Sequence, residues 1–171
     1  MASLFRLVLR HWPLAALLAS ALMLAIAHAF ERFGGLAPCT LCLRQREAYW
    51  VAMAVAAIAI GVRFTPLRGR LGWIMTALLG LVFLYGAGLA AYHAGVEWKW
   101  WPGPTACATG GGGGGTTTAD LQALLQGAKQ TAPACDKAAW VFLGLSMAGW
   151  NVLISLGLAG LSMTAALRER R

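Results

Sequence analysis

Four stretches of mostly apolar residues constrain this chain more than any other feature of its sequence. The first (11–30) and the last (138–167) contain no formally charged residue, and a third (71–95) is interrupted only by His93. An α-helix of about 20 residues spans the roughly 30 Å hydrocarbon core of a bilayer. Charged residues make up 12% of the 171-residue chain, well below the quarter or so that is typical of soluble domains. The sequence therefore predicts a single integral membrane domain (1–171).

The remaining apolar stretch is shorter than the others. Its charge-free core (48–62) would form about 22 Å of helix, which is less than the hydrocarbon thickness. The turns that precede this core must therefore enter the membrane interface. We predict an all-α membrane protein, a four-helix transmembrane bundle. The expected spans are about 12–30, 43–62, 71–94 and 139–166, and the expected loops between them on one side are about 31–42 and 95–138.

The first apolar run has a second interpretation. Its basic start, apolar middle and Ala27-His28-Ala29 sequence resemble a signal peptide with a cleavage site. Because the run is long for a signal peptide, we expect it to be retained as the first spanning helix.

Charge distribution predicts which side each end faces. The N-terminus, the 63–70 connection and the C-terminus together hold eight of the fourteen Lys and Arg residues and one acidic residue, Glu169. The opposite side has a net charge of about +1, against about +7 for this side. Because cytoplasmic loops carry the excess of Lys and Arg, both termini should be cytoplasmic. Cations at the ends of apolar runs, rather than along one face, also argue against a nucleic-acid partner despite the net charge of +8.

The loop 95–138 is the long hydrophilic segment of the chain. It contains a glycine run at 110–115 without the lysine of a phosphate-binding loop, so we interpret the run as a linker. Apolar residues then recur at helical spacing from Leu121 to Ala128, with Asp120 in the first turn. This pattern predicts a short interfacial helix lying on the bilayer surface.

All four cysteines fall on the side opposite the termini. They are Cys39, Cys42, Cys107 and Cys135. Cysteines facing an oxidising compartment favour disulfides, and local reach favours the pairs Cys39–Cys42 and Cys107–Cys135 among the three possible pairings. The tight Cys-x-x-Cys ring is typical of exchange enzymes and metal sites, so a redox pair, a metal site and a structural staple all stay open at this point. A thiol pair at the interface could pass two electrons to a lipid-soluble carrier.

Two further residues are candidates for this site. Arg46 follows Cys42 by four residues, which places both on one helix face, where a guanidinium would favour the thiolate and could hold an anionic cofactor oxygen. Its alternative role is to reach the phosphate headgroups of the membrane. His93 lies at the outer end of the third apolar run, at a depth similar to that of Arg46. A lone histidine there is more often an ordinary interface residue.

Several segments, in this order, resemble the disulfide bond formation protein B (DsbB) family. They are Pro38-Cys-Thr-Leu-Cys-Leu-Arg-Gln-Arg46, Tyr92-His93, Pro104-Thr-Ala-Cys107, Cys135 and Trp140-Val-Phe-Leu-Gly-Leu-Ser-Met147. The related vitamin K epoxide reductase family also joins thiols to quinone, but there the loop cysteines precede the Cys-x-x-Cys motif. One departure from the DsbB pattern is Gln45, where a glutamate is common in the family.

The resemblance implies a multi-pass protein of the bacterial inner membrane with its cysteines facing the periplasm. It implies an enzyme, a quinone-dependent thiol oxidoreductase that reoxidises the dithiol oxidase DsbA and reduces ubiquinone or menaquinone. It further implies that the partner attacks Cys107 and that Cys135 then pairs with Cys39. Cys42 would thereby be freed as a thiolate against the quinone, beside Arg46 and His93. The alternatives are a non-catalytic membrane scaffold stapled by two disulfides and a metal site, although we expect no metal.

Overall fold

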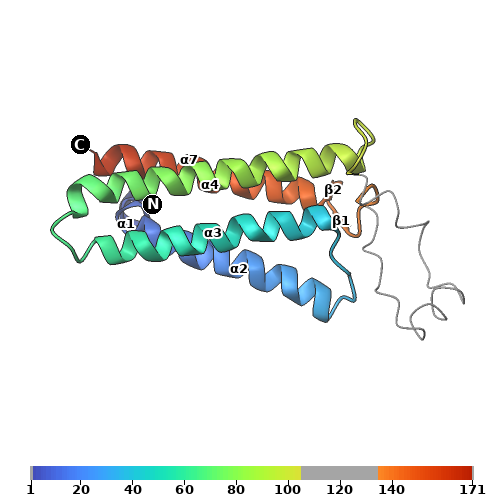
Figure 1. Ribbon diagram of the computed structural model, residues 1–171, viewed down its shortest axis with the longest axis horizontal. Coiled ribbons are helices and arrows are strands. Elements are labelled where there is room, and N and C mark those ends of the chain that lie inside the picture. The colour runs from blue at the N-terminus through green and yellow to red at the C-terminus, as the bar shows by residue number, and fades with distance from the viewer. Residues whose placement is uncertain (1, 105–134, 171) are drawn as a thin grey trace, which may run out of the picture.

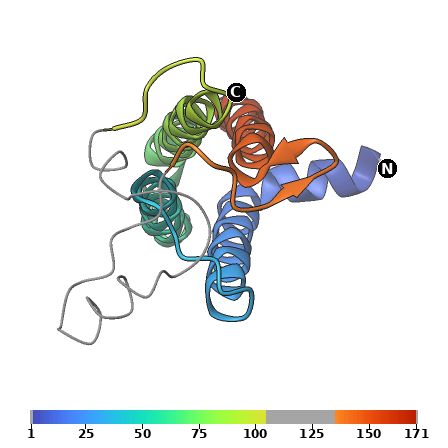
Figure 2. The same cartoon turned by 90° about the vertical axis from the view of Figure 1, so that its right-hand side faces the viewer.

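The computed structural model describes residues 2–104 and 135–170, and these residues are mostly helical. The helices are α1 (Ala2–Arg10), α2 (Trp12–Arg32), α3 (Thr40–Val62), α4 (Arg68–Glu97) and α7 (Met147–Glu169), and the strands are β1 (Val141–Phe142) and β2 (Leu145–Ser146). Helices α2, α3, α4 and α7 run side by side, with both termini at one end of the bundle and the hairpin of β1 and β2 at the other (Figure 1). Viewed from the hairpin end, α1 points away from the bundle axis (Figure 2).

Three of these helices are long and apolar enough to cross a membrane, namely α2, α4 and α7. The sequence also predicted a span at 43–62, but α3 is not among the candidate spans, so the count of four stays a prediction. The physical reason lies in its first turns, which carry Arg44, Arg46 and Glu47. Helix α3 nevertheless packs against both α2 and α4. The predicted interfacial helix and the glycine run at 110–115 lie outside the described residues.

Small side chains allow the helices to approach closely. Ala52 and Ala56 of α3 are fully buried, as is Ala90 of α4. Gly80 of α4 faces Met163 of α7 so closely that an added methyl group would lie 2.8 Å from Met163 Cε. Without a strong hydrophobic driving force between helices in lipid, such close packing supplies much of the attraction that holds a membrane bundle together.

Polar contacts tie the elements together at the end that carries the termini. Arg63, at the end of α3, donates to the Glu169 carboxylate at 2.7 Å and to the Arg10 carbonyl at 2.7 Å. The Thr76 hydroxyl of α4 donates to the other Glu169 oxygen at 2.8 Å. Glu169 therefore joins α3, α4 and α7. Both termini and the 63–70 connection lie at the same end of the bundle, and these are the segments that the charge distribution assigns to one side (Figure 1).

The last helix begins later than the sequence predicted. Residues 141–146, assigned to a span at 139–166, form an antiparallel hairpin in which Val141 pairs with Ser146. Leu143 and Gly144 both have positive φ angles (50° and 80°), as a tight two-residue hairpin turn requires. The Ser146 hydroxyl then accepts the Gly149 N–H and caps α7, which starts at Met147. A short apolar run does not distinguish strand from helix, and for that reason the boundary was wrong.

Candidate functional site

The Cys-x-x-Cys motif begins helix α3. Cys39 is the N-cap residue, and its sulfur accepts a hydrogen bond from the Cys42 backbone N–H at 3.3 Å. A side chain at this position normally satisfies one of the helix's unpaired N–H groups, and the positive end of the helix dipole favours negative charge there. The two thiols therefore lie at the start of a helix, three residues earlier than the span predicted from the sequence.

Cys39 and Cys42 are free thiols whose sulfurs are 3.0 Å apart. The pKa of Cys39 is lowered to about 4, chiefly because the Cys42 thiol can donate a hydrogen bond to the Cys39 thiolate. Burial opposes this shift, and His93 adds to it. The lower pKa of Cys39 leaves the shared proton on Cys42. The reduced pair thus favours a thiolate on Cys39, whereas the family resemblance placed the working thiolate on Cys42.

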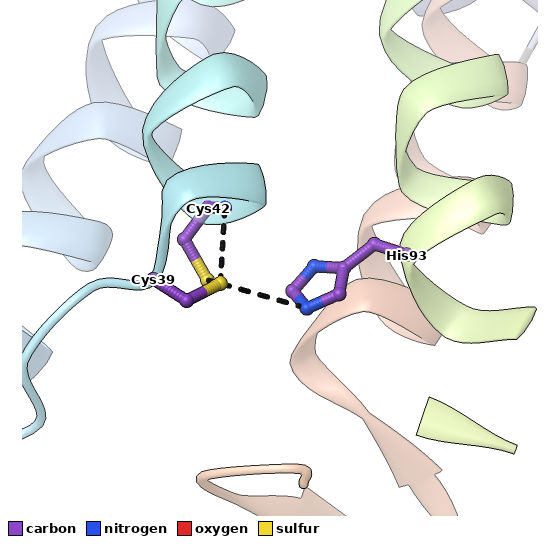
Figure 3. Close-up of side chains that lie close together, drawn as sticks. All are labelled: Cys39, Cys42 and His93. Carbon is purple, nitrogen blue, oxygen red and sulfur yellow. Dashed lines mark hydrogen bonds between the residues drawn. The ribbon is translucent and has the colours of Figure 1, made fainter. Parts of the chain in front are cut away.

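His93 faces this thiol pair from helix α4 (Figure 3). Its Nε2 atom lies 3.7 Å from Cys39 Sγ and also 3.7 Å from a carboxylate oxygen of Glu97, one turn further along α4. Both His93 and Glu97 are almost fully buried, and the other Glu97 oxygen accepts the hydroxyl of Ser146. The structure therefore brings His93 to the thiols and adds a buried carboxylate that the sequence analysis did not identify.

A chain of buried polar side chains lies behind His93. Its Nδ1 atom is 2.8 Å from Gln45 Nε2 of α3. The Asn151 amide of α7 donates to Gln45 Oε1 at 2.5 Å, and the Tyr49 hydroxyl donates to Asn151 Oδ1. Three helices thus contribute to one network, and it ends at the imidazole that faces Cys39. Helical spacing places Gln45 and Tyr49 three and seven residues after Cys42, a signal by which they could have been found.

Arg46 shares the site but does not contribute to the shifted pKa of Cys39. Its guanidinium donates to the Glu31 carboxylate at 2.5 Å and to the Ala27 carbonyl at 3.1 Å, both from α2. The side chain is 15% exposed. The thiolate is therefore favoured by Cys42 and His93, while Arg46 is held by a neighbouring helix.

A cavity of about 340 Å³ opens next to the thiols and is bounded by all four long helices. Its polar lining consists of Cys39, Cys42, Gln45, Arg46, Tyr49, His93, Glu97, Lys137 and Asn151. Its apolar lining includes Met23, Leu24, Ile26, Ala27, Phe30, Trp140, Met147, Trp150 and Ile154. A concave site with a large apolar wall and a few convergent polar groups is the usual form of a small-molecule pocket.

Cys135 lies beside the first cysteine pair. It is disulfide-bonded and 1% exposed. Its sulfur is 3.8 Å from the Thr40 hydroxyl, and it packs in one cluster with Cys39 and Val96. The structure therefore brings Cys135 to the Cys-x-x-Cys motif. Cys107, its predicted disulfide partner, lies outside the described residues.

The donor set at this site also has the composition of a metal centre. The ligand atoms of Cys39, Cys42 and His93 all lie within 4.8 Å of one another. Two thiolates on a tetrahedral zinc ion would be about 3.8 Å apart, given Zn–S bonds of about 2.3 Å. The observed separation of 3.0 Å is too short for two sulfurs on one zinc ion. The geometry favours a dithiol pair.

Comparison with known proteins assigns the chain to a family. The family described as "Disulfide bond formation protein DsbB" matches residues 9–165, which is most of the sequence. The chain belongs to the DsbB family. Membership assigns it a thiol oxidoreductase role in disulfide bond formation and confirms the resemblance seen in the sequence.

Curated relatives support the same DsbB assignment along nearly full length. Disulfide bond formation protein B of Methylococcus capsulatus is 34% identical over 150 residues, covering 84% of this chain and 85% of the relative. Disulfide bond formation protein B 2 of Pseudomonas entomophila is 32% identical over 167 residues, covering 95% of each. The protein of the same name from a Polaromonas species is 29% identical over 158 residues, covering 90% and 89%. No solved structure matches the chain.

Proposed function

We propose that this DsbB-family chain oxidises a DsbA-like periplasmic dithiol oxidase and passes the electrons through two cysteine pairs to a membrane quinone. The observation that carries the proposal is the position of the thiols: Cys39 and Cys42 line a cavity with a large apolar wall, between helices that can cross a membrane. An electron acceptor that fits there must be small and lipid-soluble. Ubiquinone and menaquinone meet both requirements.

The cavity suits the headgroup of a quinone. Its volume of about 340 Å³ lies at the lower end of the range for small-molecule pockets. Arg46 and His93 supply hydrogen-bond donors at the polar side, and apolar side chains of α2 and α7 supply a surface for an isoprenoid tail. When bound, a quinone accepts two electrons and two protons and leaves as a quinol.

The residues of this chain provide the other half of that reaction. Closing the Cys39–Cys42 disulfide releases two electrons and the one proton that the thiol–thiolate pair carries, so the second proton of the quinol would come from water. By resemblance to the family, a reduced Cys135 attacks Cys39 of the Cys39–Cys42 disulfide and frees Cys42, and it does so as a thiolate, since thiolates rather than thiols attack disulfides. The packing of Cys135 in one buried cluster with Cys39 supports this step. By resemblance to the family, Cys107 receives the electrons from the partner protein.

The proposed location follows from the same arrangement. The start of α3, which carries Cys39 and Cys42, and the chain termini lie at opposite ends of the bundle (Figure 1). With the basic end in the cytoplasm of a bacterium, the thiols face the periplasm, where a dithiol oxidase operates.

Reconstitution tests the function directly. We expect the purified chain in quinone-loaded liposomes to oxidise reduced DsbA while forming one quinol per disulfide, and Cys42→Ser to abolish both reactions. A scaffold stapled by disulfides would give neither. Thiol loss without quinol formation would refute the quinone as acceptor, and stoichiometric zinc in the purified protein would instead support the metal alternative.

A pair of arginine variants tests the quinone pocket. Arg46 lines the cavity, whereas Arg44, on the same helix, is exposed and pairs with Glu47 at 3.1 Å. Arg46→Ala should raise the KM for quinone about tenfold or more, the effect of losing one charge-assisted hydrogen bond. The matched control Arg44→Ala should leave it unchanged. Equal KM values in the two variants would contradict the assigned role.

A cysteine variant tests the electron path. Cys135→Ala removes the thiol that would resolve a mixed disulfide between Cys107 and the partner. We expect a stable covalent complex on non-reducing gels when the variant is mixed with DsbA. If no such complex forms, the proposed order of the two cysteine pairs is wrong.

A further inference from the structure

The hydrogen bonds of the buried network behind His93 run in one direction, from Tyr49 through Asn151 and Gln45 to the imidazole. Two hydroxyl groups donate to Asn151 Oδ1, those of Tyr49 at 2.5 Å and Ser155 at 3.3 Å. The Asn151 amide nitrogen is therefore left to face Gln45, and it donates to Gln45 Oε1. Gln45 then presents its own amide nitrogen, which carries only donors, to the ring of His93 at 2.8 Å.

This direction determines the tautomer of the neutral imidazole. A ring nitrogen that faces an amide N–H must accept, so Nδ1 of His93 carries no proton. In a neutral ring the proton then lies on Nε2. That nitrogen is the one 3.7 Å from Cys39 Sγ, with the Glu97 carboxylate at the same distance.

We propose that Gln45 and Asn151 are positioning residues that hold His93 in its Nε2-protonated tautomer, so that the ring donates toward the sulfur of Cys39. Among the described residues, Gln45 contacts His93 and Asn151 contacts Gln45, so both act on the sulfurs through the imidazole. The inference rests on the proposed function only in that the Cys39 thiolate takes part in the redox reaction. It goes beyond that function by proposing that Asn151 of α7 helps to stabilise this thiolate.

The consequence is a nucleophile whose reactivity depends on a distant side chain. An N–H directed at the sulfur stabilises the thiolate over the thiol, whereas a bare nitrogen would not. The groups that face the ring are Cys39 and Gln45 from the α3 end, Glu97 of α4 and the backbone of Cys135. Arg46 and Lys137 line the same cavity. The amides contribute no charge, so their effect is carried by the tautomer alone.

One substitution should reverse the direction of these hydrogen bonds while leaving Cys39, Cys42 and His93 unchanged. In Asn151→Asp both oxygens can only accept. Gln45 must then turn its amide nitrogen toward Asp and its oxygen toward His93, so Nδ1 must carry a proton. Donors from Tyr49, Ser155 and Gln45 would converge on the new carboxylate, which favours its ionised form.

The first measurement is the ¹⁵N NMR spectrum of the imidazole in the full chain in lipid nanodiscs. The chain has three histidines, so a His11→Gln/His28→Gln background leaves His93 alone. At an alkaline pH where the ring is neutral, we expect an unprotonated Nδ1 in this background and in the matched control Ser155→Ala, which keeps the Tyr49 donor. We expect a protonated Nδ1 in Asn151→Asp and in Gln45→Glu, where a carboxylate would accept from the ring.

The second measurement is the pH dependence of Cys39 alkylation, read from the peptide between Arg32 and Arg44 by fragmentation mass spectrometry. Asn151→Asp should move the midpoint of the alkylation curve up by about one to two pH units, the effect of losing one hydrogen bond to a charged sulfur. Ser155→Ala should not change it.

Three outcomes would overturn the proposal. They are a protonated Nδ1 in the neutral ring of the unaltered site, an unprotonated Nδ1 in both carboxylate variants, and an unchanged alkylation midpoint in an Asn151→Asp protein whose Nδ1 has become protonated. Gln45→Glu keeps the NMR test available if Asn151→Asp does not fold. Neither measurement involves a quinone, so a failure of quinone reduction would refute the proposed function and leave this inference standing.

Discussion

The ionisation of Cys39 gives the sharpest prediction from this structure. Its pKa is lowered to about 4 because the thiolate accepts hydrogen bonds from Cys42 and His93. A lowered pKa means that the thiolate is present at every pH above about 4 and is lost only below it. An ordinary cysteine with a pKa of about 8.5 is about 0.1% thiolate at pH 5.5 and about half thiolate at pH 8.5. Its alkylation rate therefore rises about 500-fold over that range.

For Cys39 we expect a rate that changes less than about twofold between about pH 5.5 and pH 8.5, since almost all of it is already thiolate. The assay is alkylation of the reduced, folded protein with a small neutral iodoacetamide, followed by fragmentation of the peptide that contains both thiols. Burial of Cys39 slows the reaction equally at every pH, so the slope is the test rather than the absolute rate.

Cys42→Ala is the matched variant for this experiment. It removes the strongest hydrogen bond to the thiolate, so the midpoint of the alkylation curve should move to higher pH and a slope should appear between pH 5.5 and 8.5. A tenfold rise in rate for each pH unit through the neutral range in the unaltered protein would refute the reasoning. A flat profile in both proteins would refute the role assigned to Cys42.

Two further predictions concern packing and are measured as the free energy of unfolding in detergent. Trp12→Phe removes the buried hydrogen bond from the indole N–H to Ser162 Oγ (2.9 Å), so it should cost about 1–2 kcal/mol while Cys39 alkylation stays unchanged; no loss of stability would contradict the contact. Gly95→Ala drives a methyl carbon into the Trp101 ring and should cost about 1–3 kcal/mol. Gly88→Ala meets nothing within 4 Å and is its control, and equal costs for the two would contradict the packing.

Much of the helical framework follows from the sequence because hydrophobic length is a strong signal. The charge-free runs become α2 and α7, and the third run becomes α4. The limits arise where local and long-range preferences compete. The hairpin around Gly144 lies in an apolar run, and only its turn residues and the capping Ser146 separate it from the helix.

The sequence indicates the type of chemistry at the candidate site, but it does not show which side chains contact one another there. The spacing of Cys39 and Cys42 indicates a dithiol, and the structure places His93 beside it. The pairing of Arg46 with Glu31 depends on where α2 lies against α3, which residue spacing within one helix does not encode. The same holds for Asn151, which the sequence shows only as a polar residue in an apolar run.

The sulfur of Cys39 is both the first hydrogen-bond acceptor of helix α3 and a redox-active atom. A thiolate is a strong acceptor for the Cys42 amide, whereas a disulfide sulfur is a weak one. Each oxidation therefore loosens the first turn of α3, and each reduction tightens it. The oxidation state of Cys39 thus controls how well the first turn of α3 is ordered. Hydrogen exchange at the Cys42 amide should therefore be faster in the oxidised protein. The order of the start of α3 would then report whether the Cys39–Cys42 pair is reduced or oxidised.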